Sequence, residues 1–284
     1  MTLMQRFDLA AAARESGIRR KEIILRPIEP RRATEVELQR VLTRMVAGIY
    51  ARARSDILPR VNAERSVLAL DSISDRLGSL FGAFRQAVER LLGGVQGLAQ
   101  GLLEKEAARH TERFREAASA ATGVDLRMVL RPADVGEVVE IAAKRSAIAI
   151  SGLAADVVKK VEQAALTSLV GGVQKPLEQQ LEEDQDAAKR RSKLIAQDQV
   201  IQLVAVLNRT RQTQAGVEQY VWATRRDERV RRTHQANEGR IFRWDSAPPT
   251  GHPGTAPNCR CRALAILKIE NGTVTIKPTV YRSV

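Results

Sequence analysis

The only two cysteines of the chain, Cys259 and Cys261, follow two of its three histidines, His234 and His252. The four residues have the spacing His-x17-His-x6-Cys-x-Cys, and Asp227 lies seven residues before the first of them. Imidazole nitrogen and thiolate sulfur are ligand atoms that suit Zn²⁺, and a carboxylate oxygen can join them. These five residues are therefore candidate ligands of a structural zinc ion.

The spacing leaves other interpretations open. Cys-x-Cys in a strand directs its side chains to opposite faces, so both thiols can reach one ion only if the chain turns at Asn258–Cys259 or bulges at Arg260. Buried cysteines also serve as small apolar packing residues. Alternatively one thiol is buried and only the other serves a site, and His234 is a hydrogen-bonded core residue. A disulfide within the pair is the least favoured alternative because it closes a small, strained ring.

The composition indicates which elements position these residues. Of 284 residues, 44% are hydrophobic but only 4% are aromatic, so the core must be built from Leu, Val, Ile and Ala. Such a core favours helices packed on helices. The sequence predicts a mainly α protein with a C-terminal α+β domain, in which long N-terminal helices precede a small module of helix and antiparallel strands.

The pattern along the chain divides it further. Residues 1–35 end in "RPIEPRR" and predict an exposed N-terminal arm without a core element. Apolar residues then recur at three- and four-residue steps, as from Val67 to Leu91, and predict helix to about residue 121. Glycines at positions 93, 94, 97 and 101 are expected to break or kink this helix. Residues 122–136 predict a connection, and two further helical segments run to Gly216, which is expected to end the last of them.

Beyond Gly216 the composition changes, and the sequence contains short runs rich in β-branched and aromatic residues. The runs "YVWAT", "RIFRW", "CRALAIL" and "TVTIKPTVY" predict strands separated by turns. The N-terminal arm of residues 1–35 is therefore followed by three predicted parts: a helical region over residues 36–185, a compact domain over 186–268 and a tail over 269–284.

The charge is strongly basic, with 46 Lys and Arg against 33 Asp and Glu and a net charge of +13. A basic surface attracts polyanions such as nucleic acid, an acidic protein or an anionic membrane, although charge alone does not choose between them. Residues 222–262 hold nine arginines and four acidic residues. Arginine is suited to bidentate phosphate contacts, so the candidate DNA contacts are Arg225, Arg226, Arg232 and Arg262. The sequence has no secretory apolar region and no apolar stretch long enough to span a membrane, which predicts a cytosolic protein when made.

The stretches "NRTRQTQAGVEQYVWATRRDERVRRTHQANEGRIF" and "PPTGHPGTAPNCRCRALAI" carry a family resemblance. Their ordered pattern resembles the phage Mu F-like minor head proteins, also called phage head morphogenesis proteins, over about residues 186–268. The matched motif positions include Gly216, Tyr220, Trp222, Asp227, Arg229, Arg231, His234, Gly239, Cys259, Arg260 and Cys261.

This resemblance implies a structural virion protein of a tailed phage or phage-like particle, at the portal vertex or in the capsid interior. It implies a role in head assembly or in DNA packaging and ejection, with portal and major capsid proteins as partners and double-stranded DNA nearby. Several copies per particle are expected, with host cytoplasm as the location during assembly and the helical region as the docking part. No enzymatic activity is expected.

Individual residues have physical roles in this interpretation. Tyr220 and Trp222 are expected in the core of the small domain, and Arg260 is expected to point away from the cysteines. Asp227 lies among five arginines, Arg225, Arg226, Arg229, Arg231 and Arg232, and is expected to pair with one of them. The alternative function is a zinc-dependent hydrolase or nuclease-like enzyme using Asp227 and His234, but the sequence has no His-Glu-x-x-His motif to support it.

Overall fold

The structure, a computed structural model, describes residues 7–64, 73–170 and 175–269. Long helices precede a small four-stranded antiparallel sheet with a short helix, so the predicted fold class is confirmed. The chain forms two compact units, one of residues 32–103 and 141–199 and the other of residues 1–31, 104–140 and 200–284. The predicted domain boundaries remain a prediction, and the helix of residues 177–214 runs through position 186 without a break.

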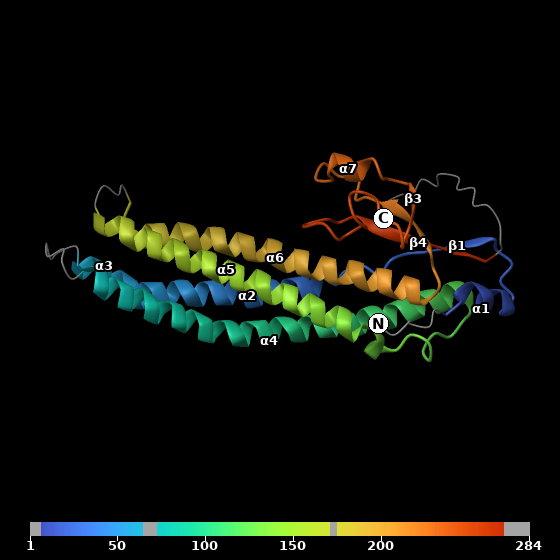
Figure 1. The fold of residues 1–284 in the computed structure, drawn as a ribbon, viewed down its shortest axis with the longest axis horizontal. Helices are drawn as coiled ribbons and strands as arrows, with labels where there is room; N and C mark the ends of the chain where they lie inside the picture. The colour runs from blue at the N-terminus through green and yellow to red at the C-terminus, as the bar shows by residue number, and fades with distance from the viewer. Residues whose placement is uncertain (1–6, 65–72, 171–174, 270–284) are drawn as a thin grey trace. The chain divides into compact units, whose positions relative to one another are not determined.

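The first unit consists of helix α2 and of parts of the long helices α4, α5 and α6, which Figure 1 labels. They span Arg32–Arg52, Ile73–Thr122, Gly136–Val170 and Leu177–Gln214. A π-helical segment, Ala53–Ile57, and α3, Leu58–Glu64, follow α2. Ion pairs between neighbouring helices, such as Arg85 with Glu162 and Lys160 with Asp184, each at 2.8 Å, lie outside a core of buried aliphatic side chains.

The expectation that glycines break the first long helix is wrong, because α4 continues through all of them. The buried side of α4 explains why the helix continues through the glycines. Val88, Val95, Ala99 and Leu103 recur at helical spacing and are at most 9% exposed, so packing stabilises the helix against the unfavourable glycines. The first residues of the predicted apolar series, Val67 and Leu70, lie outside the described residues.

The second unit contains the sheet, in the order β1-β4-β2-β3 with antiparallel neighbours. Its strands are β1 (Glu22–Leu25), β2 (Gln219–Ala223), β3 (Ile241–Arg243) and β4 (Arg262–Lys268), and α7 is Arg232–Gln235. Three of the predicted strands are therefore present. The fourth, "TVTIKPTVY", and the tail beyond Ile269 lie outside the described residues.

The prediction that the first 35 residues hold no core element is wrong. Residues Leu9–Glu15 form α1, in which Leu9 and Ala13 are fully buried. Strand β1 pairs with β4, and its Ile23 and Leu25 join the same apolar cluster as the buried residues of the C-terminal strand. The run "EIIL" supplies the apolar side chains that make this edge strand part of the core.

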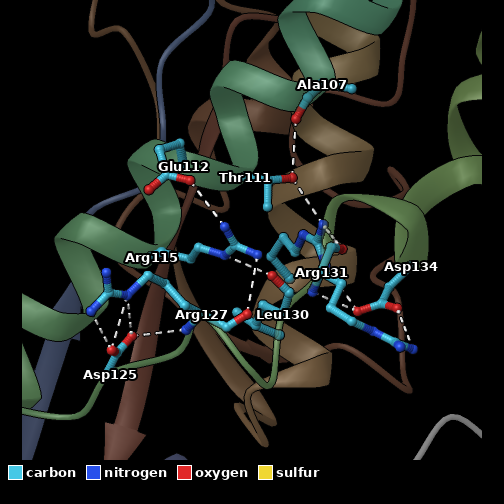
Figure 2. A network of polar contacts seen from close by, with 10 residues as sticks. Ala107, Thr111, Glu112, Arg115, Asp125, Arg127, Leu130, Arg131 and Asp134 are labelled. Atoms are coloured by element: carbon cyan, nitrogen blue, oxygen red, sulfur yellow. Dashed lines mark hydrogen bonds and ion pairs between the residues drawn. The ribbon is translucent and has the colours of Figure 1, made fainter.

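Arginine side chains donate hydrogen bonds to backbone carbonyls of the connection between α4 and α5 and hold it in place (Figure 2). Arg115 donates from Nε to the carbonyl of Leu130 at 2.7 Å and from Nη2 to that of Arg127 at 3.3 Å. At the end of the connection Pro132–Val135 forms a 3₁₀ turn, where Asp134 accepts from the backbone N–H of Arg131 at 2.8 Å. The predicted connection is thus an ordered loop whose carbonyls have side-chain donors.

Gly216 ends α6 as predicted. It has φ +78°, and the N–H of the following residue, Val217, donates to the carbonyl of Gln212 at 2.9 Å, which closes the helix. A Cβ at Gly216 would lie 2.6 Å from the carbonyl oxygen of Phe7.

Replacing Gly216 with alanine is therefore expected to be strongly destabilising. Left-handed backbone costs an alanine about 1–2 kcal/mol, and the clash with Phe7 adds to this, so we expect a loss of about 2–4 kcal/mol. Denaturant unfolding of the full chain measures it. Gly239→Ala is the matched control, since Gly239 also has positive φ, +72°, but its Cβ would meet nothing within 4 Å. Equal losses in both variants would contradict the role of the Phe7 contact.

Candidate metal centre

Three buried side chains converge beside the sheet, and two local structures position them. The short helix α7 holds His234, which is 4% exposed. A turn before β4 holds Cys259 and Cys261, which are 3% and 8% exposed. The cysteines precede the strand, and Asn258 has φ +55°, so the chain turns at the position that the sequence required for both thiols to face one point.

The distances suit a tetrahedral ion. His234 Nδ1 lies 3.4 Å from Cys259 Sγ and 3.6 Å from Cys261 Sγ, and all three ligand atoms lie within 4.8 Å of one another. With Zn–S of about 2.3 Å and Zn–N of about 2.0–2.1 Å, tetrahedral geometry places nitrogen and sulfur about 3.6 Å apart. The group can therefore hold a metal ion such as Zn²⁺.

The site favours one thiolate. A hydrogen bond from the Cys261 thiol lowers the pKa of Cys259, although burial opposes the shift. The backbone N–H of Gly254 donates to Cys259 Sγ at 3.4 Å and also stabilises its anion. The same thiol–thiol hydrogen bond, together with burial, raises the pKa of Cys261. A thiolate is the form that binds a metal, so the lowered pKa favours Cys259 as a ligand.

Gly254 is a site residue that the sequence interpretation missed. Its φ is +81°, and a Cβ would lie 2.5 Å from Cβ of Ala205 on α6. The absence of a side chain lets this loop lie against α6 while its N–H reaches the sulfur. The only signal in the sequence was a glycine in a Pro- and Gly-rich loop.

An aromatic cluster surrounds the three ligands. Trp222 is fully buried on β2 and meets the ring of His234 edge-on, with centroids 5.3 Å apart. Tyr220, also fully buried, lies 4.2 Å from the ring of Trp244. The predicted core role of Tyr220 and Trp222 is confirmed, and the cluster keeps water away from the site.

His252 and Asp227, the other two candidate ligands, lie elsewhere. His252 Nδ1 lies 2.8 Å from the hydroxyl of Tyr220, and burial lowers its pKa to about 4, so its ring is neutral at pH 7. Asp227 accepts from Arg260 at 2.8 Å and from the backbone N–H of Arg229 at 3.2 Å. The expected ion pair of Asp227 is present, but its partner is Arg260 and not one of the five neighbouring arginines.

The remaining motif residues shape the loops around the site. Arg231 donates to the carbonyl of Pro257 at 2.7 Å, which ties the start of α7 to the turn before the cysteines. Gly239 has φ +72°, and its N–H donates to the carbonyl of Trp222 at 2.8 Å. Both contacts hold the elements that carry the ligands.

Most of the arginines proposed to contact DNA are paired with carboxylates. Arg225 and Arg262 both pair with Glu29 at 2.8 Å, and Arg226 pairs with Glu238 at 2.9 Å. Arg232 is exposed and forms no ion pair with any residue that the structure describes. Two carboxylates thus pair with three of the four arginines and offset two of the four positive charges.

Comparison with known proteins identifies the segment that carries this site. Residues 158–264 match the family described as Phage Mu protein F like protein. An uncharacterized protein of Haemophilus influenzae (strain ATCC 51907 / DSM 11121 / KW20 / Rd) is 29% identical over 189 residues, which are 66% of this chain and 42% of that relative. This chain therefore spans less than half the length of the relative. No solved structure matches the chain.

Proposed function

We propose, from the premise that residues 158–264 form a Phage Mu protein F-like domain, that this protein is a structural minor head protein of a tailed phage or phage-like particle. Its site of action is the portal vertex or the capsid interior, where it serves head assembly or the packaging and ejection of DNA. Its partners are the portal protein, the major capsid protein or both, in several copies per particle. The family match is the observation that carries the proposal.

The helical region supplies docking surfaces in this proposal. The outer side of α5 exposes Ile141 (67%), Ile148 (74%) and Leu166 (45%). None of the described helices combines the length and the hydropathy needed to cross a membrane. Apolar side chains on an exposed helix suit protein contacts, which supports portal or capsid subunits as partners.

The metal centre has a structural role in this proposal. His234, Cys259 and Cys261 hold Zn²⁺, which cross-links α7 to the turn before β4. The group supplies three ligands to a tetrahedral ion, and no other His, Cys, Asp or Glu in the described part of the chain joins the group at the fourth position. All three ligands are at most 8% exposed, so a substrate would have little access to that position. Asp227, the candidate general base of the enzymatic alternative, is paired with Arg260. These contacts favour a structural centre over a hydrolytic one.

Purified particles provide the test of the head-protein function. We expect the protein to be present at a fixed copy number by quantitative mass spectrometry of particles separated from free protein on a gradient. We also expect an amber mutation early in its gene to reduce the yield of filled heads, with an amber suppressor strain as the control. Normal filled heads that lack the protein would contradict the proposal.

DNA contact is a secondary proposal, supported by the net charge of +13. Because Arg225, Arg226 and Arg262 are paired with acids, we expect Arg232→Ala to weaken retention on double-stranded DNA more than Arg225→Ala does. Retention should fall steeply with salt because phosphate contacts release counterions. Electrophoretic mobility shifts across a salt series measure both effects. Absence of retention at low salt would contradict DNA contact.

A further inference from the structure

The side chain of Trp222 carries a buried hydrogen-bond donor without an acceptor. Trp222 is fully buried, and its indole N–H has no partner at hydrogen-bonding geometry among the described residues. A buried tryptophan N–H ordinarily finds a partner, because it gives up its hydrogen bond to water on folding. The other tryptophan follows this rule, since Nε1–H of Trp244 donates to Gln212 Oε1 at 3.2 Å. The exception at Trp222 therefore needs a reason.

The sheet fixes the position of this donor. Strand β2 lies between β4 and β3, and Trp222 lies opposite Ala263 of β4. On the other side of the strand, the backbone N–H of Trp222 donates to the carbonyl of Arg240 at 2.9 Å. Cys261 comes two residues before Ala263, and such diagonal neighbours are within reach of a large aromatic side chain. Trp222, Ala263 and Cys261 accordingly belong to one buried cluster.

The indole N–H favours the thiolate form of Cys261. The hydrogen bond to Cys259 and burial raise the pKa of the Cys261 thiol, whereas a hydrogen-bonding interaction with the side chain of Trp222 acts in the opposite direction. A donor lowers a pKa in this way when it stabilises the charged form. The indole is therefore close enough to the sulfur to donate to it when Cys261 is a thiolate.

Metal binding creates the need for such a donor. Both cysteines lose their protons when they bind an ion, so the hydrogen bond between the two thiols cannot persist. The sulfur of Cys259 keeps the backbone N–H of Gly254 as a donor, at 3.4 Å. The sulfur of Cys261 is buried, and Trp222 offers it an equivalent N–H. Groups that hydrogen-bond to metal ligands orient those ligands and tune the affinity of the site.

We propose that Trp222 is a positioning residue of the metal centre, and that its indole N–H donates to the Cys261 thiolate when the centre holds an ion such as Zn²⁺. The hydrogen bond orients the sulfur and offsets part of the negative charge that two thiolates bring into the core. This inference rests on the structural metal centre proposed above and does not depend on the head-protein role.

Metal affinity of the full chain is the first test. Trp222→Phe keeps an aromatic ring in the cluster but removes the N–H, so we expect Zn²⁺ to bind about tenfold or more weakly in competition with a chromophoric chelator. Trp244→Phe is the matched control, because Trp244 belongs to the same cluster but donates to Gln212. An unchanged affinity in Trp222→Phe, or equal losses in the two variants, would overturn the proposal.

Cobalt spectroscopy tests the hydrogen bond separately from stability. A hydrogen bond to a thiolate stabilises the sulfur electrons, so its loss lowers the energy needed to transfer one of them to the metal. In the Co²⁺-loaded full chain, Trp222→Phe should therefore move the sulfur-to-cobalt charge-transfer band to longer wavelength, whereas Trp244→Phe should leave it in place. A band at the same wavelength in Trp222→Phe as in the wild type would overturn the proposal.

The wild-type chain provides a test that remains decisive if Trp222→Phe does not fold. Replacing zinc with cadmium changes the metal–sulfur bonds, so it should shift the indole N–H resonance of Trp222 more than that of Trp244 in nitrogen–proton correlation spectra. Equal shifts would overturn the proposal. A wild-type chain that binds neither zinc nor cobalt would overturn both this proposal and the metal centre, whereas the head-protein role is judged separately on purified particles.

Discussion

Chelation of the metal is expected to unfold the C-terminal module of the full chain. Structural zinc contributes about 10–16 kcal/mol of apparent binding free energy in small domains, which is comparable to the whole free energy of unfolding of a typical domain, about 5–15 kcal/mol. Without the ion, Cys259, Cys261 and His234 would tie α7 to the turn only through weak thiol–imidazole hydrogen bonds. Native mass spectrometry should show one zinc per chain, and near-ultraviolet circular dichroism should report the loss of order around Trp222 and Trp244.

Ligand variants make this result specific. Cys259→Ser and His234→Ala are each expected to remove the zinc and to lower the melting temperature of the module. Asp227→Asn is the control, because it breaks only the partly exposed pair with Arg260 and is expected to cost about 1 kcal/mol or less while the zinc remains. If the purified chain has the mass of the protein without zinc, and its melting temperature is the same before and after chelation, the prediction is contradicted and the cysteines are packing residues.

Replacing Arg211 with alanine is the second variant with a large expected effect. Arg211 is fully buried on α6, and it donates to Thr111 at 2.8 Å, to the carbonyl of Arg131 at 2.7 Å and to Gln214 at 2.8 Å. Burial lowers its pKa to about 10, so it is still charged at pH 7, and Asp134 lies 3.8 Å away. Truncation removes the donor from two buried acceptors and one partly buried acceptor, and it opens a cavity. We expect a loss of about 3–5 kcal/mol in denaturant unfolding.

Two further variants separate the causes of that loss. Arg211→Met retains much of the volume but none of the donors, so a loss close to that of Arg211→Ala would assign the effect to the hydrogen bonds. Arg113→Ala, which removes an exposed arginine 3.8 Å from Glu116, should change stability by about 0.5 kcal/mol or less. A similarly small effect for Arg211→Ala would show that water replaces the guanidinium without penalty.

Local patterns in the sequence were enough to predict most helices and three strands. Helix α5 and helix α6 have apolar periodicity over many turns, and Gly216 marks the end of α6 because only glycine adopts its backbone conformation without strain. The metal candidates Cys259 and Cys261 were identifiable by residue type, and the necessary turn at Asn258 was stated as a condition of their convergence. These features depend on neighbours within a few residues, which the sequence displays directly.

The glycine stretch of α4 shows where local patterns mislead. Glycine predicts a break because it is unfavourable in an isolated helix. The helix continues because Val95, Ala99 and Leu103 bury the opposite side against the rest of the bundle. Tertiary packing therefore outweighed the local preference.

The sequence by itself determined the helical class of this protein, its small C-terminal module and the residue types of its candidate metal centre. Only the tertiary structure decided that β1, near the N-terminus, pairs with β4, and that Asp227 pairs with Arg260 and not with a nearer arginine. It also decided that His252 meets Tyr220 and not the cysteines. Such choices depend on which distant segments the folded core brings together, because many arginines or apolar runs satisfy the same local pattern and only packing selects among them.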